Sequence, residues 1–129
     1  MLAYRHAFHA GNHADVLKHA VLVQVLRYML LKDKPFTLID THAGAGGYSL
    51  EGRYAQKKAE YAQGVARLWA RQDLPPPLAD YVALVRQFNG GAGPGPHAAH
   101  VAFEQYPGSP AFAQMLLRPQ DRLRLFELH

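Results

Sequence analysis

The residues with the most specific spacing for chemistry lie around a glycine-rich turn. Phe36 to Asp40 is a short, nearly continuous apolar run that ends in a carboxylate and predicts a strand of a parallel sheet covered on both faces. Gly44 and Gly46 follow in the spacing D-x-x-x-G-x-G. Glycines after such a strand let the backbone approach a ligand closely, at the sheet edge where cofactors bind. The dinucleotide fingerprint G-x-G-x-x-G does not fit, because its third glycine would fall at Ser49.

An acid near the far end of the chain could complete this site. The spacing D-x-x-x-G-x-G is that of Rossmann-type S-adenosylmethionine enzymes, although a turn that only packs a helix on a strand is the alternative. Glu127 ends the last expected strand, where a carboxylate can accept hydrogen bonds from both ribose hydroxyls. Glu127 follows the glycine turn by many more than the usual ~20 residues, which indicates an insertion between the turn and this acid. An exposed strand-end glutamate is the other interpretation.

The N-terminal segment holds a cluster of basic and aromatic side chains: Tyr4, Arg5, His6, Phe8, His9, His13, Lys18 and His19. The spacing of His6, His9 and His13 invites a zinc site, because imidazole is the commonest metal ligand. However, His6 and His9 precede the expected helix, so we predict no metal site. A basic surface that meets a phosphate or a carboxylate fits better, with Lys18 as a point charge, unless it is only a solvated lysine. The aromatic residues could stack on an RNA base or fill the core.

Periodicity and helix breakers predict the elements of the first third of the chain. Asn12 is an expected N-cap with Asp15 three residues later, and the helix runs to about Lys32. Pro35 then ends it. The apolar residues that recur at helical spacing are Val16, Leu17, Ala20, Val21, Val25, Tyr28 and Leu31.

The middle of the chain predicts more helices. One is expected over about 54–72, with its single tryptophan, Trp69, in the core. Its basic residues form either a solvated face or a contact with RNA backbone, namely Lys57, Lys58, Arg67 and Arg71. A triple proline opens a helix over 78–88, and the glycine- and proline-rich residues 89–100 predict a loop.

The end of the chain returns to the sheet. A turn at 106–110 leads into a helix through Leu117, and residues 122–128 alternate as a strand. The whole order is a βαβ beginning with a helical insertion, which predicts an α/β, Rossmann-like fold. Two strands are too few for a stable doubly wound domain, so the fold is expected to be incomplete at the C-terminus.

Composition limits the class of protein. With 129 residues, 49% of them hydrophobic and 19% charged, the chain fits one small folded domain. Its net charge of +4 permits a nucleic-acid partner without requiring one. The absence of cysteine excludes disulfides, zinc fingers, iron–sulfur clusters and thiol catalysis. The most apolar stretch is shorter than the ~20 residues of a membrane span, and no signal peptide is evident, so we expect a cytoplasmic monomer that makes no membrane contact.

The sequence resembles a known family, the RlmJ methyltransferases of bacteria, which modify an adenine at N6 in 23S ribosomal RNA. The resemblance rests on segments from Met1 to His129: Met1–His19, Asp33–Phe36, Asp40–Gly46, Tyr106–Pro110 and Glu127–His129. It implies a Rossmann-like S-adenosylmethionine-dependent methyltransferase fold with an inserted helical subdomain. The implied parts are residues 1–47 (tail, helix, first strand and cofactor turn), 48–105 (helical subdomain and long loop) and 106–129 (return helix and second strand).

The resemblance also implies roles for individual residues. The cofactor S-adenosylmethionine would be bound by Lys18, His19, His42, Gly44, Gly46, Ser109 and Glu127. Glu127 would hold the ribose, the glycine turn would admit the methionine part, and Lys18 would face its carboxylate. Tyr4 and His6 resemble part of a mobile segment that closes near the target adenine, and with Lys18 they are the expected catalytic residues. The partner is 23S ribosomal RNA.

Two departures from the family pattern stand out. The loop over 89–105 looks longer than usual, which we interpret as surface variation. More seriously, adenine-N6 methyltransferases of this type have a D/N-P-P-Y/F segment after the fourth strand, and nothing here matches it. Asp73-Leu-Pro-Pro-Pro77 has the wrong spacing and no aromatic residue. The sequence therefore predicts that these 129 residues alone do not transfer methyl groups.

Other functions remain open on the residues alone. A strand, a glycine turn and a distant acid also suit a nicotinamide-dependent oxidoreductase, although the missing third glycine argues against it. The basic tail and helices would also suit a non-catalytic RNA-binding module. A truncated or split product without activity is a third alternative.

Overall fold

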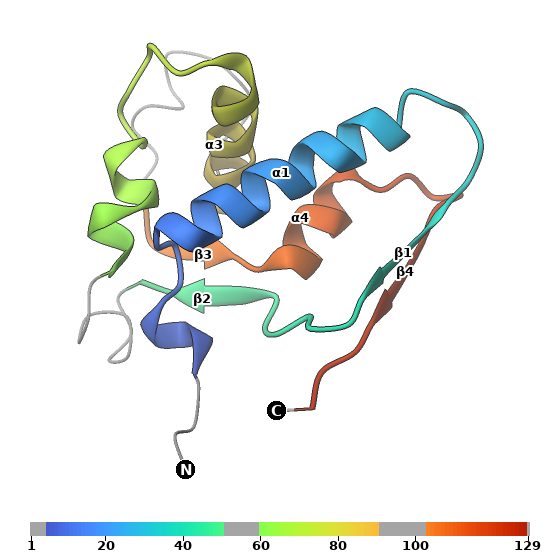
Figure 1. Ribbon diagram of the computed structural model, residues 1–129, viewed down its shortest axis with the longest axis horizontal. Helices are drawn as coiled ribbons and strands as arrows, with labels where there is room; N and C mark the ends of the chain where they lie inside the picture. Colours follow the sequence, from blue (N-terminus) through green and yellow to red (C-terminus); the bar gives the residue numbers. More distant parts are fainter. Residues whose placement is uncertain (1–4, 51–59, 91–102, 129) are drawn as a thin grey trace.

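The computed structural model describes residues 5–50, 60–90 and 103–128. Helix α1 crosses the middle of the molecule, α3 packs on one side of it, and strands β1 and β4 pair at one end (Figure 1). The elements are η1 (His6–Phe8), α1 (His13–Met29), β1 (Thr37–Asp40), β2 (Gly47–Ser49), η2 (Glu60–Gln63), η3 (Val65–Arg67), α3 (Pro76–Phe88), β3 (Gln105–Pro107), α4 (Ser109–Leu116) and β4 (Arg122–Leu125).

Helix α1 begins where the sequence predicts and ends slightly earlier. The Asn12 side chain accepts a hydrogen bond from the backbone N–H of Asp15 at 2.9 Å, which satisfies one of the free donors of the first turn. The helix ends at Met29 with Leu30 as its C-cap, short of the expected Lys32. The N-cap prediction is confirmed.

The apolar residues that predict α1 are mostly not the ones that face the core. The buried residues of the helix are instead Asp15, His19, Val23 and Leu26. These contact α3 and α4, whereas Leu17, Val21, Val25, Tyr28 and Leu31 remain exposed on the opposite side. Because α1 is apolar on two sides, helical periodicity finds the helix but does not select its buried face.

The two strands expected to pair in parallel do so. Leu38 lies opposite Leu123, and the pairing continues past the strands, since the N–H of Phe126 donates to the Asp40 carbonyl at 2.9 Å. The return strand β4 ends at Leu125 rather than at Leu128, because the Phe126 carbonyl accepts from the N–H of Ala43 and thereby joins the glycine turn. This places the residue after Phe126, Glu127, beside that turn.

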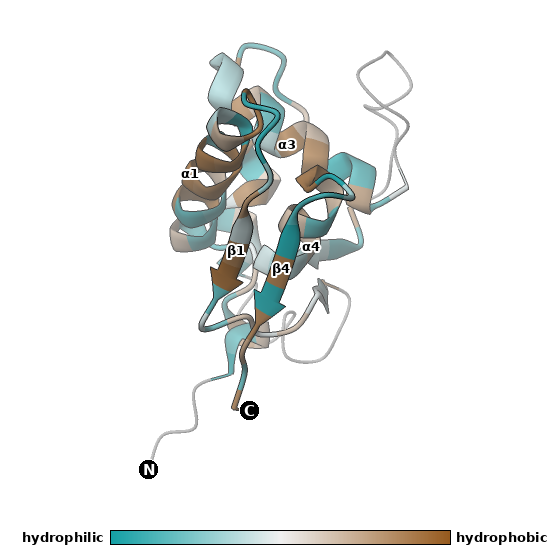
Figure 2. Cartoon of the chain, turned by 90° about the vertical axis from the view of Figure 1, so that its right-hand side faces the viewer, coloured by the Kyte–Doolittle hydropathy of each residue, from teal (hydrophilic) through white to brown (hydrophobic). Residues whose placement is uncertain are grey.

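The β1–β4 pair is covered on one face rather than two by the described residues. Figure 2 shows the two strands side by side with α1, α3 and α4 behind them. Ile39 and Phe126 are each more than half exposed. The expectation of a strand covered on both faces therefore does not hold within the described part of this chain.

A second, antiparallel pair was not expected from the sequence. Strand β2 pairs with β3, and Tyr48 lies opposite Tyr106. The pairing extends by one bond from the N–H of Leu50 to the Glu104 carbonyl at 2.9 Å. Each strand has three residues and contains or borders glycine and proline, so local sequence predicts turns at both places.

The expected helix over 54–72 is wrong in its described part. Residues 60–67 form the two short 3-10 turns η2 and η3, interrupted at Gly64. A Cβ on Gly64 would lie 2.1 Å from the Gly11 carbonyl oxygen, and the N–H of Val65 donates to that oxygen at 2.9 Å. This close approach to the N-terminal segment replaces helical bonds. Residues 54–59, including Lys57 and Lys58, lie outside the described residues.

The other elements match their predictions with small shifts. Helix α3 begins at Pro76, two residues earlier than expected, because proline suits the first helical position. Helix α4 ends one residue early at Leu116. Trp69 packs against the core, as predicted, and its ring stacks on that of Phe103 with ring centroids 4.6 Å apart. Most of the expected 89–100 loop lies outside the described residues. None of the described helices combines the length and the apolar character that a membrane span requires.

Candidate functional site

The predicted site residues surround one pocket of about 300 Å³ where β1 and β4 end. A pocket of this size is at the lower end of the range for small-ligand sites. Its lining consists of His6, Lys18, His19, His42, Ala43, Gly44, Tyr48, Gly108, Ser109 and Glu127. The residues expected to bind the cofactor or to act in catalysis are all among them except Gly46, which does not line the pocket, and Tyr4, which lies outside the described residues. The structure thus brings together seven residues from four separate segments.

Glu127 holds the glycine turn. One carboxylate oxygen accepts a hydrogen bond from the N–H of Gly44 at 2.5 Å, and the other accepts from the N–H of Leu128 at 2.9 Å. Gly44 has a φ of +65°, and an added Cβ would lie 2.7 Å from the hydroxyl of Tyr48. Among the described residues other than its chain neighbours, nothing lies within 4 Å of a Cβ built on Gly46, so the second glycine borders open space in this part of the structure.

Asp40, the first residue of the D-x-x-x-G-x-G spacing, positions two pocket residues. The hydroxyl of Ser109 donates to one of its carboxylate oxygens, and the N–H of His42 donates to the other at 3.1 Å. The His42 ring nitrogen Nδ1 lies 2.9 Å from the Thr41 hydroxyl. Asp40 therefore fixes the start of α4 and the first residues of the turn in relation to the end of β1.

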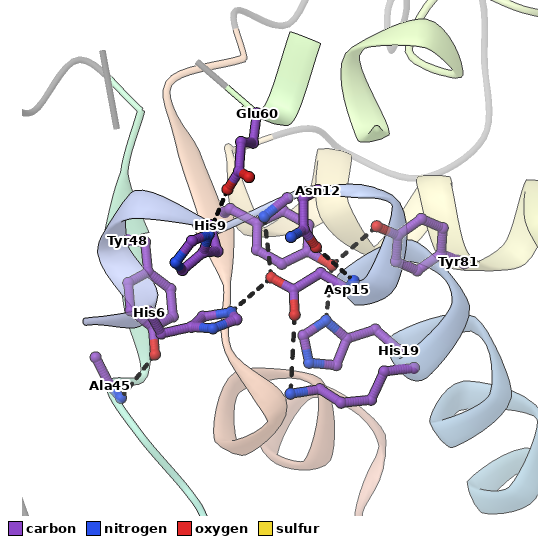
Figure 3. Close-up of polar contacts among 12 residues, drawn as sticks. His6, His9, Asn12, Asp15, His19, Ala45, Tyr48, Glu60 and Tyr81 are labelled. Carbon is purple, nitrogen blue, oxygen red and sulfur yellow. Dashed lines mark hydrogen bonds and ion pairs between the residues drawn. The ribbon is translucent and has the colours of Figure 1, made fainter. Parts of the chain in front are cut away.

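A buried carboxylate forms the N-terminal side of the site (Figure 3). Asp15 is 2% exposed, and its Oδ2 lies 2.7 Å from the Nε2 of His6 and accepts from the N–H of Gly11 at 3.0 Å. The Lys18 ammonium lies 3.8 Å from Oδ1. Burial by itself would raise the pKa of Asp15, but the His6 hydrogen bond and the neighbouring charges outweigh it and lower that pKa. The carboxylate stays ionised and holds the His6 and Lys18 side chains at the pocket.

His19 is the most enclosed residue of the pocket. Its Nδ1 lies 2.7 Å from the hydroxyl of Tyr106, which lies 2.9 Å from the hydroxyl of Tyr81. Burial lowers the pKa of His19 to about 4, and the nearby Lys18 adds to this, while Asp15 opposes it. The imidazole is therefore neutral near pH 7. Within the described part of the chain its Nε2 has no hydrogen-bond partner.

Sequence reasoning missed the tyrosines of the site. Tyr48 accepts a hydrogen bond from the N–H of Ala45 at 3.2 Å, and its ring meets the edge of the His6 ring at 5.2 Å. An aromatic residue directly after a glycine turn was the available signal. No local signal predicts the contact of Tyr106 with His19, because the two residues are 87 positions apart.

The three N-terminal histidines do not converge. His6 meets Asp15, whereas the Nδ1 of His9 lies 2.5 Å from a carboxylate oxygen of Glu60. His13 is exposed at the start of α1. In residues 5–50, 60–90 and 103–128, no group of three or more side chains is arranged to bind a metal ion.

A ligand pocket at the carboxyl ends of paired parallel strands is where open α/β sheets bind their ligands. Comparison with known proteins identifies the class further. The family described as "Ribosomal RNA large subunit methyltransferase D, RlmJ" matches residues 33–129. The chain belongs to this RlmJ family.

Individual relatives match over the whole chain. It is 49% identical over 129 residues to Ribosomal RNA large subunit methyltransferase J of Escherichia coli (strain K12), and 46% identical to the protein of that name from Haemophilus influenzae. In both cases the match covers 43% of the relative, so the chain spans less than half the length of these proteins. A crystal structure of a protein from Legionella pneumophila is 39% identical, with a TM-score of 0.77, over 93% of this chain and 40% of that one.

Proposed function

We propose that this chain is the cofactor-binding part of an S-adenosylmethionine-dependent methyltransferase that modifies the N6 amine of an adenine in 23S ribosomal RNA. The two relatives are named as methyltransferases of large-subunit ribosomal RNA. We infer that the activity belongs to a longer protein and that it takes place in the cytoplasm, where bacterial ribosomal RNA is found. We also infer that the protein acts as a monomer.

One observation supports the proposal most directly, which is the chemical complementarity of the pocket. An ammonium and a buried, unpartnered imidazole nitrogen come from α1, and a carboxylate comes from the end of β4. An S-adenosyl compound needs donors for its carboxylate and acceptors for its ribose hydroxyls and amine. Lys18 and His19 can donate to the carboxylate, and Glu127 can accept from the ribose hydroxyls.

The other lining residues have roles that follow from their positions. The two Glu127 oxygens accept from the N–H groups of Gly44 and Leu128, and because a carboxylate oxygen can accept more than one hydrogen bond, this side chain suits ribose hydroxyls. Gly44 and Gly46 would leave room for the methionine part, since the space around Gly46 is open. The Ser109 hydroxyl donates to Asp40, so it can only accept from a ligand. His42 would complete the rim.

The cofactor would supply an electrophilic methyl group, and the chain's own residues would hold the reactants. His6, Lys18 and Tyr4 are the proposed catalytic residues. The first two lie at the pocket beside Asp15. An adenine that is single-stranded or turned out of its stack could reach the pocket from this side. The contribution of these residues would be positioning and electrostatic support, with no metal.

We also propose the finer architecture. A Rossmann-like sheet would comprise β1 and β4, with a helical subdomain inserted after the first strand. The parts would be residues 1–47, 48–105 and 106–129. The parallel pairing of β1 with β4 around an intervening segment supports this, because parallel strands need a long crossover connection.

Binding of S-adenosylhomocysteine, measured by calorimetry on the 129-residue chain, tests the proposal. Glu127→Gln and Lys18→Ala should each weaken binding about tenfold or more, since each removes a charged partner. The matched controls are Glu104→Gln and Lys32→Ala, at exposed positions away from the pocket. Preferential binding of NAD would support a dinucleotide enzyme instead. Unchanged affinity in both site variants would reject the assignment and favour an RNA-binding module.

A further inference from the structure

Three polar side chains form a chain of hydrogen bonds beneath the pocket. Tyr81 and Tyr106 are both 0% exposed, and His19 is 1% exposed. Burial raises the pKa of each phenol above its usual value, so both keep their protons near pH 7. Each tyrosine hydroxyl therefore has one proton that needs an acceptor, and neutral His19 has one proton on either Nδ1 or Nε2.

The direction in which these hydrogen bonds are donated follows from counting the protons. If Nδ1 of His19 donated to Tyr106, then Tyr106 would donate to Tyr81, and the Tyr81 proton would have no acceptor among the described residues. In the opposite direction Tyr81 donates to Tyr106 and Tyr106 donates to Nδ1, so both tyrosine protons are bonded. A buried donor without an acceptor has lost its hydrogen bonds to water without replacement, which favours the second direction.

In that direction the proton of His19 sits on Nε2. This is the ring nitrogen that has no partner in the described part of the chain. In Figure 3 it faces away from Tyr81, and His19 lines the pocket. The charged or titratable groups that act on the ring are Asp15, Lys18, His6 and Asp40. An N–H donor beside the Lys18 ammonium suits an anionic acceptor.

We propose that Tyr106 is a positioning residue that holds His19 as its Nε2–H tautomer, so that Nε2–H donates to the carboxylate of the cofactor's amino-acid part. This inference rests on the proposed function for the identity of the ligand. Tyr81 donates to Tyr106 and polarises the bond, but it does not decide the tautomer. Without Tyr81, the Tyr106 proton would still have His19 as its acceptor.

The tautomer can be read directly in the ligand-free 129-residue chain. Long-range ¹H–¹⁵N correlation of the histidine rings distinguishes a protonated from an unprotonated ring nitrogen. We expect an unprotonated Nδ1 and a protonated Nε2 for His19. A protonated Nδ1 would overturn the inference, whatever ligand the pocket binds.

Two variants of the same kind separate positioning from packing. Tyr106→Phe and Tyr81→Phe each remove one buried hydroxyl. We expect Tyr81→Phe to retain the Nε2–H tautomer, and Tyr106→Phe to lose the single tautomer and to bind S-adenosylhomocysteine about fivefold more weakly, as for the loss of one hydrogen bond. Equal effects of the two variants on tautomer and affinity would indicate a structural role only and would overturn the inference.

A truncated ligand identifies the acceptor. Methylthioadenosine lacks the amino-acid part, so its affinity should be the same for the wild-type chain and for Tyr106→Phe. A loss of methylthioadenosine affinity equal to that of S-adenosylhomocysteine would exclude the carboxylate as acceptor. Failure of the wild-type chain to bind either compound would instead reject the proposed function, while the tautomer measurement would still decide the role of Tyr106.

Discussion

At the scale of single residues, the site depends on carboxylates that already have protein partners. Asp40 fixes His42 and Ser109, Asp15 holds His6, and Glu127 accepts from the glycine turn. The hydrogen bonds of these carboxylates therefore position the residues that line the pocket. The neutral, enclosed His19 is different, because its burial couples folding to protonation.

His19 predicts a loss of stability in mild acid. Its pKa is about 4 in the folded chain and 6.5 as the reference, so the unfolded state binds more protons between these values. The free energy of unfolding should therefore fall as the pH is lowered from 6.5 to 4, by up to about 3 kcal/mol. Urea unfolding measured across this pH range should show a free energy of unfolding that changes steeply with pH for the wild type and only slightly for His19→Gln.

A matched substitution at an exposed histidine controls this experiment. His13→Gln lies on the same helix at an exposed position, so it should keep the wild-type slope. The lowered pKa of Asp15 acts in the same direction but below its reference value of 3.8, outside the window for His19. A His19→Gln slope equal to that of the wild type would contradict the prediction.

At the scale of elements, the turn between β1 and β2 links the fold to the site. Two glycines of this turn, Gly44 and Gly46, are in different structural environments. Gly44 adopts a left-handed conformation against Tyr48, whereas no described residue other than the chain neighbours of Gly46 comes within 4 Å of a Cβ built there. One glycine is thus required by the folded chain itself, and the other is compatible with a side chain until a ligand is present.

Alanine at each glycine should separate stability from binding. Gly44→Ala should destabilise the chain by about 1–2 kcal/mol, because it places a Cβ in the left-handed region. Gly46→Ala should leave the melting temperature unchanged but weaken binding of S-adenosylhomocysteine. Thermal melting and calorimetry on both variants test this. A Gly46→Ala variant that is less stable, or that binds as well as the wild type, would contradict it.

At the scale of the whole molecule, a stripe of apolar side chains on α1 lies open. Tyr28 is 73% exposed and Val25 is 53% exposed, whereas Val23 on the opposite side is 0% exposed. Contiguous exposed apolar patches mark interaction surfaces, so we expect a further part of a longer protein to cover this stripe. The chain spans 43% of its relatives, which leaves more than half of their length to provide such a cover.

Charge substitutions on the two sides of α1 test this. Val25→Lys should change the stability of the 129-residue chain by less than about 0.5 kcal/mol, as for an exposed position. The equivalent change in the longer Escherichia coli relative should be strongly destabilising. Val23→Lys is the control and should destabilise both proteins, because it buries a charge without a partner. Equal tolerance of Val25→Lys in the two proteins would argue that nothing covers the stripe.

Methyl transfer to RNA also depends on the whole molecule. The 129-residue chain lacks a D/N-P-P-Y/F segment, so it should not methylate an unmethylated 23S RNA fragment, although it should bind S-adenosylhomocysteine. The longer Escherichia coli relative, assayed beside it, should transfer the methyl group. Transfer of radioactive methyl groups to the RNA measures both proteins. Turnover by the 129-residue chain would contradict the prediction.

Features that depend on neighbouring residues could be predicted from the amino-acid sequence. The Asn12 cap, strand β1, the glycine turn and the start of α4 after Tyr106-Pro-Gly all follow from capping, periodicity and turn chemistry. The spacing around Asp40 also indicated the pocket before its shape was known. These signals are local, so a single sequence contains them.

Features that depend on contacts between distant residues became visible in the folded chain. The tertiary structure selected the buried side of α1, paired β2 with β3, and broke the expected helix at Gly64 because that residue meets Gly11. It also placed Tyr106 against His19 across 87 positions. Such contacts form when separate elements exclude water from a shared core, and periodicity along one segment contains no information about which distant side chain will be its neighbour.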